Sequence, residues 1–239
     1  MSKGKVYIIP IPISENTLDK VLPNFNQRII SGLRHFVVER TKTARQYLRK
    51  VDREFPIDDS VFYEYNKHNN YSFSKEAIDQ LNNGNDVGLI SEAGYPGIAD
   101  PGANFIAAAH QVDAQIIPLI GPSSIFLALA ASGMNGQGFT FHGYPPIKDP
   151  ERSSFLKKIT ELAEKTGYAQ ILIETPYRNE RLLEDCIKQN KNDLSLTIAY
   201  DITGEREQII TKPMAFWKKK PFSFDKTPCV FILGTTRQQ

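Results

Sequence analysis

Cysteine, histidine and long uninterrupted hydrophobic runs are all scarce in this chain of 239 residues. Its two cysteines, Cys186 and Cys229, lack the spacing of a redox or metal-binding motif, so we expect inert free thiols. Such usage is typical of a reducing compartment, and it favours a cytoplasmic protein. The four histidines are scattered along the chain, and we therefore expect no metal site.

The sequence also lacks features of membrane insertion. The segment Met1-Ser-Lys-Gly-Lys5 leads directly into a strand-like run without the apolar region of a signal peptide. Residues 114–147 carry no formal charge, but prolines and glycines interrupt them repeatedly. No span of about 20 apolar residues survives these interruptions, so we expect no membrane-spanning helix.

The chain has almost no excess of charge of either sign, because 29 basic residues are balanced by 27 acidic ones. The resulting net charge of +2 excludes a polyanion binder that uses its whole surface, and any nucleic-acid interface must be a local patch. The composition, 41% hydrophobic and 23% charged, is that of a globular protein large enough for one large or two modest domains.

Strands and helices are predicted to alternate along the first half of the chain. This alternation predicts an α/β fold with a mainly parallel sheet covered on both faces. The expected strands are residues 5–9, 35–38, 61–65, 87–90 and 115–119, and the expected helices are residues 17–30, 41–55, 73–81 and 103–111.

The second half changes character after Gly121-Pro122, where we place the boundary between a domain of residues 1–121 and one of residues 122–239. Ser123 and Ser124 can cap an apolar helix over 125–131. The remaining expected helices are residues 151–165 and 177–190, and the expected strands are residues 139–144, 169–173, 194–200, 208–211 and 229–233.

The loop Ile90–Gly102 is the most informative segment. Its three glycines and two prolines lie between a buried strand and a helix. Glycine has no Cβ, so such a loop brings backbone amides and carbonyls close to a ligand. The carboxyl end of a strand is also where open α/β sheets bind small molecules. The alternative is an ordinary tight turn between strand and helix.

Five segments of the chain occur in an order typical of one protein family. They are Ser91–Gly102 (SEAGYPGIADPG), Pro118–Ser124 (PLIGPSS), Ala131-Ser-Gly133, Phe141–Pro146 (FHGYPP) and Glu174–Arg178 (ETPYR). With these segments the chain resembles the tetrapyrrole-methylase superfamily, the class III S-adenosylmethionine methyltransferases. Within it, the chain is most similar to the bacterial 16S ribosomal RNA cytidine 2′-O-methyltransferase branch.

Several positions depart from that branch. Its Thr-Pro-Ile-Gly-Asn loop becomes Ile11-Pro-Ile-Ser-Glu15, and its Glu-Asp-Thr-Arg becomes Glu39-Arg-Thr-Lys42. Its Ser-Asp-Ala-Gly becomes Ser91-Glu-Ala-Gly94, and its Glu-Leu-Thr-Lys becomes Asp201-Ile-Thr-Gly204, which loses the lysine. These changes bear on the RNA substrate more than on the methyl donor.

The resemblance implies two αβα domains, the second with a mixed sheet, S-adenosylmethionine held between them, an RNA substrate and a homodimer. It implies that the backbone near Tyr95 and Ile98 holds the methionine part of the cofactor, beside Gly94 and Gly97. Each assigned side chain could instead be ordinary packing. The remaining cofactor positions that it implies are Ser123, Ser124, Ile125, Thr175, Tyr200 and Pro228.

Methyl transfer to a ribose hydroxyl requires alignment and a group that accepts the hydroxyl proton. Candidate bases are Glu39, Glu92 and Glu174, and we favour Glu92 because it lies in the cofactor loop. Glu39 can instead be an acid at a helix N-terminus, and Asp100 can simply cap the helix over 103–111. Candidate cationic helpers are Arg45, Lys42 and Arg178.

A basic stripe recurs at spacings of three and four along the helix over 41–55. It consists of Lys42, Arg45, Arg49 and Arg53. This stripe either follows an RNA backbone through phosphate contacts or is a solvated helix face. Lys218-Lys-Lys220 is interpreted as surface, and His142 either touches substrate or is satisfied by hydrogen bonds.

Two rival functions stay open. The chain can be a small-molecule methylase acting on a tetrapyrrole or another metabolite. The loss of the branch's lysine at Gly204 favours this alternative. It can also be a cofactor-binding protein without catalysis. The altered first loop, Ile11–Glu15, and Arg40 favour this alternative.

Overall fold

A computed structural model describes residues 2–65, 75–189, 191, 193–220 and 222–236. Its internal contacts divide the chain into two compact units, residues 1–123 and 124–239. This division falls two residues beyond the boundary expected at Gly121-Pro122. Each unit is described below by itself.

The first unit contains a sheet of five parallel strands in the order β3-β2-β4-β1-β5. The central strands are buried on both faces, which explains their runs of valine, isoleucine and leucine. The sheet confirms the parallel α/β architecture predicted for this half. Its strands are β1 (Lys5–Ile9), β2 (His35–Val38), β3 (Val61–Glu64), β4 (Val87–Ile90) and β5 (Gln115–Pro118).

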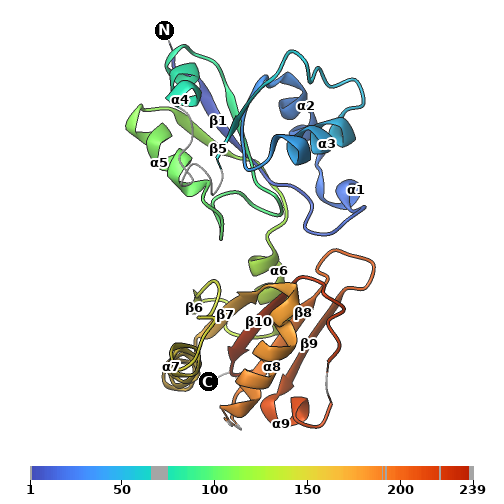
Figure 1. The fold of residues 1–239 in the computed structure, drawn as a ribbon, viewed down its shortest axis with the longest axis vertical. Coiled ribbons are helices and arrows are strands. Elements are labelled where there is room, and N and C mark those ends of the chain that lie inside the picture. Colours follow the sequence, from blue (N-terminus) through green and yellow to red (C-terminus); the bar gives the residue numbers. More distant parts are fainter. Residues whose placement is uncertain (1, 66–74, 190, 192, 221, 237–239) are drawn as a thin grey trace. The chain divides into compact units, whose positions relative to one another are not determined.

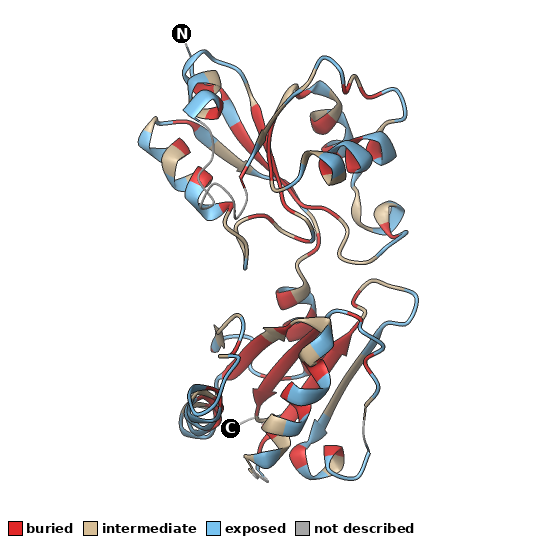
Figure 2. Cartoon of the chain, viewed as in Figure 1, coloured by how far each residue is buried: buried red, intermediate tan, exposed pale blue. Residues whose placement is uncertain are grey.

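Helices cover both faces of this sheet (Figures 1 and 2). Alternate strand residues serve opposite cores, since Phe36 and Val38 pack with α2 and α3, whereas Val37 packs with α4 and α5. The result is a three-layer arrangement. The helices are α1 (Leu18–Val21), α2 (Asn24–Gly32), α3 (Thr41–Val51), α4 (Lys75–Asn82) and α5 (Ala103–Gln111).

Two predicted helices of this unit were wrong in their extent. The helix expected over 17–30 is interrupted at Leu22, whose backbone is extended (φ −103°, ψ 99°), because Pro23 disfavours a helical conformation in the residue before it. The helix expected over 41–55 ends at Val51; Phe55 is nevertheless buried and packs edge-on against Phe36. Residues 73 and 74 of the helix expected over 73–81 lie outside the described residues.

The second unit contains a mixed sheet in the order β6-β7-β10-β8-β9. Strands β6 and β7 are parallel and the other neighbours are antiparallel, which confirms the mixed sheet implied for this half. Strand β6 ends before the expected Tyr144, and Gly143 turns the chain with a φ of 68°. The strands are β6 (Phe139–Phe141), β7 (Ala169–Glu174), β8 (Ser195–Tyr200), β9 (Gln208–Pro213) and β10 (Cys229–Gly234).

Helices α7, α8 and α9 share one hydrophobic core with one face of this sheet. Helix α6 lies on the other face, where the Thr211 hydroxyl donates to the Ser132 carbonyl at 2.7 Å. Residue 190 at the expected end of the helix over 177–190 lies outside the described residues. The helices are α6 (Ser124–Ser132), α7 (Glu151–Thr166), a 3₁₀ turn (Pro176–Arg178), α8 (Asn179–Lys188) and α9 (Met214–Trp217).

None of the helices in the described part of the chain combines the length and the apolar character that crossing a membrane requires.

Candidate active site at the carboxyl edge of the first sheet

The topology of the first sheet produces a crevice at its carboxyl edge. Neighbouring strands β1 and β4 lead to helices on opposite faces, β1 to α1 and α2 and β4 to α5. Their loops therefore diverge, and open α/β sheets bind ligands where loops diverge in this way. The Ile11 N–H donates to the Gly94 carbonyl at 2.9 Å and ties the two loops together at their base.

The glycine-rich loop is folded around its own carboxylate. Asp100 Oδ1 accepts hydrogen bonds from Gly97 N–H at 2.9 Å and Gly102 N–H at 2.6 Å. Burial raises the pKa of Asp100, and these two backbone bonds oppose the rise. Asp100 thus closes the turn that leads into α5, whereas the N-cap of α5 is Gly102 and no side chain caps the helix, so the capping role expected for Asp100 is not observed. The Gly97 amide is thus satisfied by Asp100, and the Ile98 N–H donates to the Tyr95 carbonyl at 3.3 Å, so a ligand would meet the remaining backbone groups of the loop.

Two of the predicted catalytic carboxylates meet at this edge. Glu39, after β2, accepts a hydrogen bond from the Glu92 backbone N–H at 3.3 Å. Burial raises the pKa of Glu39, opposed by that backbone bond and reinforced by the charges of Asp100 and Glu92. A carboxylate with a raised pKa holds a proton more readily, which suits acid–base chemistry.

The Glu92 carboxylate points to α3 rather than to Glu39. Its Oε2 accepts from the Thr43 hydroxyl at 3.2 Å and lies 4.0 Å from Arg40 Nη1. Arg40 and Glu92 are both departures from the family pattern, and in this chain they face each other with opposite charge. The exposed Arg40 therefore offsets the acidity of the site rather than disrupting it.

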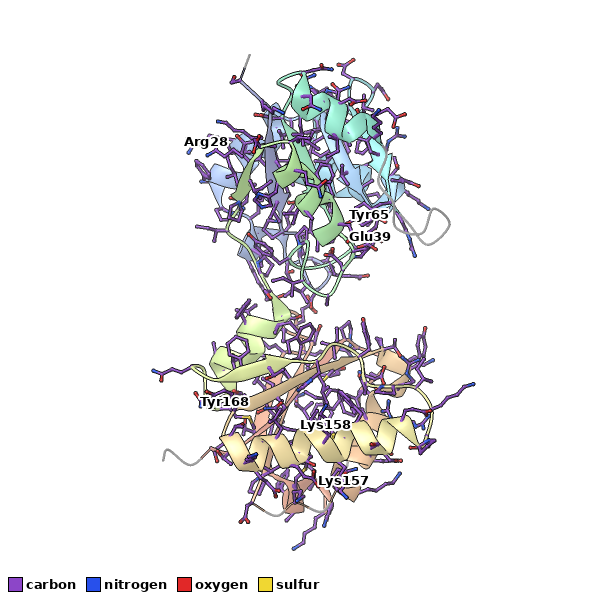
Figure 3. The ribbon with its side chains drawn as sticks, turned by 90° about the vertical axis from the view of Figure 1, so that its left-hand side faces the viewer. Arg28, Glu39, Tyr65, Lys157, Lys158 and Tyr168 are labelled. Carbon is purple, nitrogen blue, oxygen red and sulfur yellow. The ribbon has the colours of Figure 1, made fainter. Side chains whose placement is uncertain are left out.

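A tyrosine that the sequence did not single out adjoins these acids. Tyr65, at the end of β3, is buried, and its hydroxyl has no hydrogen-bond partner among the described residues. Burial raises its pKa, and the charges of Asp100, Glu39 and Glu92 raise it further. Figure 3 labels Tyr65 beside Glu39. Nothing distinguishes this residue in sequence among the chain's ten tyrosines.

A cleft of about 970 Å³ opens beside Glu92 within the first unit. Its walls are the loop after β1, the α1–α2 turn, one stripe of α3 and the Glu92-Ala93 peptide. This volume lies in the range of small-molecule sites. The α3 stripe consists of Thr43, Gln46, Tyr47 and Lys50.

Arg45, the third predicted catalytic residue, lies on the neighbouring stripe of α3. Its guanidinium sits 5.2 Å from the centre of the Phe62 ring. It lines a separate groove of about 600 Å³ with Arg49 and Asp58, and not the Glu92 cleft. Arg45 is therefore placed for contact with an extended ligand over α3.

In the second unit, three predicted cofactor positions converge at one end of the sheet. Glu174, Cys229 and Tyr200 are in register on β7, β10 and β8, which brings Thr175, Pro228 and Tyr200 together. The Tyr200 hydroxyl donates to Thr227 Oγ1 at 3.1 Å. Thr175 Oγ1 is buried without a partner among the described residues. Ser124 and Ile125 begin α6, immediately after Ser123.

Glu174 is not available as a base. Its carboxylate accepts from Arg152 Nη1 at 3.1 Å, Arg178 Nη2 at 2.7 Å and Thr175 N–H at 2.8 Å. Burial alone would raise the pKa of Glu174, but these hydrogen bonds outweigh it, and the pKa is lowered. The side chain of Arg152 is only 1% exposed. Glu174 and Arg178 therefore belong to an ion-pair network with Arg152, and this engagement disfavours the catalytic roles for which they were candidates.

His142 has a partner: its Nε2 lies 2.8 Å from Gln170 Oε1, in line with the hydrogen-bonded interpretation. No cluster of three or more histidine, cysteine, aspartate or glutamate side chains suited to a metal occurs in the described ranges.

Comparison with known proteins fits this geometry. The model of the family Tetrapyrrole (Corrin/Porphyrin) Methylases matches residues 27–215, and the chain belongs to that family. The chain has the fold of the crystal structure of the methyltransferase CobJ, with a TM-score of 0.61 and 15% identity over 99% of this chain and 97% of that one.

Curated relatives extend the comparison. The Ribosomal RNA small subunit methyltransferase I of Vibrio cholerae is 29% identical over 213 residues, covering 88% of this chain and 69% of that protein. The Synechocystis protein of the same name is 30% identical over 181 residues, covering 72% and 61%. The Escherichia coli O157:H7 protein is 26% identical over 241 residues, covering 100% and 80%. The chain thus spans less than two thirds of the Synechocystis relative.

These matches confirm the predicted superfamily and its similarity to the ribosomal RNA branch, and they confirm the chain as a member of a methyltransferase family.

Proposed function

We propose that this chain transfers a methyl group from S-adenosylmethionine to a ribose 2′-hydroxyl of small-subunit ribosomal RNA. The observation that carries the proposal is the position of the Glu92 carboxylate. It lines a cleft of about 970 Å³ and belongs to the glycine-rich loop assigned to the methyl donor. The relatives named for ribosomal RNA methylation supply the substrate class.

The residues assigned to S-adenosylmethionine have features that suit such a ligand. Gly94 and Gly97 adopt positive φ values of 69° and 83°, which turn the loop backbone as side-chain-bearing residues rarely can. The Tyr95 hydroxyl donates to the Leu119 carbonyl at 3.0 Å, which ties the glycine-rich loop to the residue after β5. The buried Thr175 hydroxyl has no hydrogen-bond partner in the described part of the chain, so it offers a donor and an acceptor to an adenosine.

The bound cofactor supplies an activated methyl group, so the protein must align the acceptor oxygen and remove its proton. We assign proton removal to Glu92, whose carboxylate faces the cleft. Glu39 acts as a positioning residue, since it holds the Glu92 backbone through the hydrogen bond of 3.3 Å. A correctly placed base of this kind contributes about 10²–10⁴-fold to a rate.

RNA binding is assigned to the exposed basic stripe of α3. Lys42, Arg45 and Arg49 are all exposed and lie beside the Glu92 cleft on the same helix. Their positive charges can contact phosphates without reading sequence, which agrees with a protein whose net charge is only +2. A homodimer, implied by the resemblance, and a cytoplasmic location, favoured by the cysteine usage, stay predictions.

Salt dependence tests the assignment of RNA to α3. We expect the affinity for small ribosomal subunits to fall steeply with salt, and the double reversal Arg45→Glu, Arg49→Glu to flatten the slope by about 0.7–0.9 for each lost phosphate contact. The matched control is Arg28→Glu on α2, an exposed position that lines neither cavity. If the salt slope is equal in the wild type and the double variant, the α3 stripe does not contact RNA phosphates. No salt dependence in the wild type would favour a small-molecule acceptor.

A further inference from the structure

Helix α3 presents two adjacent polar stripes to two cavities. Thr43, Gln46, Tyr47 and Lys50, spaced by three and four residues, line the Glu92 cleft. Arg45 and Arg49 line the neighbouring groove of about 600 Å³. Gln46 and Lys50 line both cavities, so these two side chains form the ridge that separates the basic groove from the cleft.

The ridge side chains are available for a ligand. Gln46 and Lys50 are exposed and have no hydrogen bond or ion pair within the described part of the chain. Other polar residues nearby are engaged: the Gln27 amide donates to the Val51 carbonyl at 2.9 Å, and the Tyr47 hydroxyl donates to the Pro10 carbonyl at 3.4 Å. The cleft thus has fixed walls and a rim with a free amide and a free ammonium.

These two groups differ in what they recognise. A carboxamide offers a donor and an acceptor side by side, which matches the edge of a nucleobase, whereas an ammonium is a point charge suited to phosphate. An RNA strand on Arg45 and Arg49 would have its bases within reach of the ridge. Enzymes that modify a nucleotide commonly extrude it from the stack into such a pocket.

We propose that the Glu92 cleft receives a single nucleotide extruded over the Gln46–Lys50 ridge. Gln46 hydrogen-bonds the edge of its base, and Lys50 contacts the phosphate at the rim. The inference rests on the proposed function and deepens it, because it assigns nucleotide selection to α3. Glu92, whose carboxylate accepts from the Thr43 hydroxyl on the same helix and lines the same cleft, then faces the ribose of the extruded nucleotide.

The test compares Gln46→Ala, Lys50→Ala and the control Arg28→Ala, which removes the same charge as Lys50→Ala from an exposed site outside both cavities. Figure 3 labels Arg28. Each variant is first compared with wild type in thermal unfolding and in affinity for S-adenosylmethionine, which should be unchanged. Single-turnover methyl transfer and binding are then measured with small ribosomal subunits from cells that lack this protein, and the methylated nucleotides are mapped.

We expect Gln46→Ala to bind the subunits within about twofold of wild type, yet to transfer methyl groups about 5- to 150-fold more slowly and to label additional nucleotide types. Lys50→Ala should lower the salt slope of binding by about one, and Arg28→Ala should match wild type. If the wild type is active and both ridge variants match it in methyl-transfer rate, nucleotide selectivity and salt slope, this inference is wrong while the proposed function stands. A wild type that transfers no methyl group would overturn the proposed function as well.

Discussion

Glu92 and Glu39 are neighbours with different surroundings, and this difference separates their roles. The Glu92 side chain is 32% exposed and lines the cleft, whereas burial raises the pKa of Glu39 behind it. Of the two acids, only Glu92 is accessible to a methyl acceptor and also has its carboxylate held in place, by the hydroxyl of Thr43. Chemistry at this edge should therefore depend on Glu92 directly and on Glu39 through it.

Glu92→Gln should lower the single-turnover rate of methyl transfer to small ribosomal subunits by about 10²–10⁴-fold, because the amide still accepts from Thr43 but takes up no proton. The affinity for S-adenosylmethionine, measured by calorimetry, should stay within twofold. Glu39→Gln is the matched control and should lose much less, since an amide oxygen can still accept from the Glu92 backbone. A Glu92→Gln rate within threefold of wild type would exclude Glu92 as the base.

Some residues of the site could be predicted from the sequence and others could not. Glu39, Glu92 and the loop glycines follow buried strands, so their place at the carboxyl edge was predictable. Tyr65 carries no such signal. Arg152 begins a charged helix that suggests solvent exposure, yet it is buried between Glu174 and Asp185, at 3.1 Å and 2.7 Å. Burial of an ion pair depends on tertiary packing, which local sequence does not reveal.

At the scale of elements, alternation of strands and helices was sufficient for the parallel sheet, and β1, β2, β4 and α5 have the predicted bounds. The predicted helix bounds are wrong where a local backbone preference overrides the hydrophobic spacing from which they were predicted. Pro23 divides one predicted helix, and the turn before Phe55 lets an apolar residue stay buried after α3 has ended. Helix α9, of four residues, was missed because it is too short to show a period.

The Arg152–Glu174–Arg178 network joins α7, β7 and the 3₁₀ turn, so it should contribute to stability. Glu174→Gln should lower the free energy of unfolding at pH 7 by roughly 1–3 kcal/mol, because it removes the charge that faces Arg152 and Arg178, while Asp185 still pairs with Arg152. The pKa of Glu174 is lowered in the folded state. Its contribution is therefore present above the unfolded pKa of about 4.3 and is lost as pH falls through the folded value.

Urea unfolding at pH 7 and at about pH 3.5 checks this prediction, and the difference between wild type and Glu174→Gln should shrink at the lower pH. Glu161→Gln is the control, because its side chain is 53% exposed and its ion pair with Lys157 spans 4.0 Å. Such exposed pairs contribute little. Equal stability of the two variants at pH 7 would show that the network does not stabilise the unit.

At the scale of the whole molecule, a net charge of +2 conceals a strong local asymmetry. The exposed cations of α3 lie next to a cleft that contains Glu92, so a basic surface adjoins a carboxylate-bearing cleft. Overall composition could not reveal this arrangement, because it arises from the spacing of residues on one helix. The proposed RNA substrate requires an external basic surface of this kind, whereas a small-molecule acceptor would not.

The most direct test of the account is methyl transfer itself. Purified protein is incubated with S-adenosylmethionine labelled in its methyl group and with small ribosomal subunits from cells that lack the protein. The RNA is then digested and its nucleotides are analysed by mass spectrometry. We predict label in the RNA, on a ribose 2′-oxygen at a defined position, and none when Glu92 is replaced by glutamine. Protein that binds the cofactor yet leaves the RNA unlabelled, while the Escherichia coli relative labels the same subunits, would contradict the account.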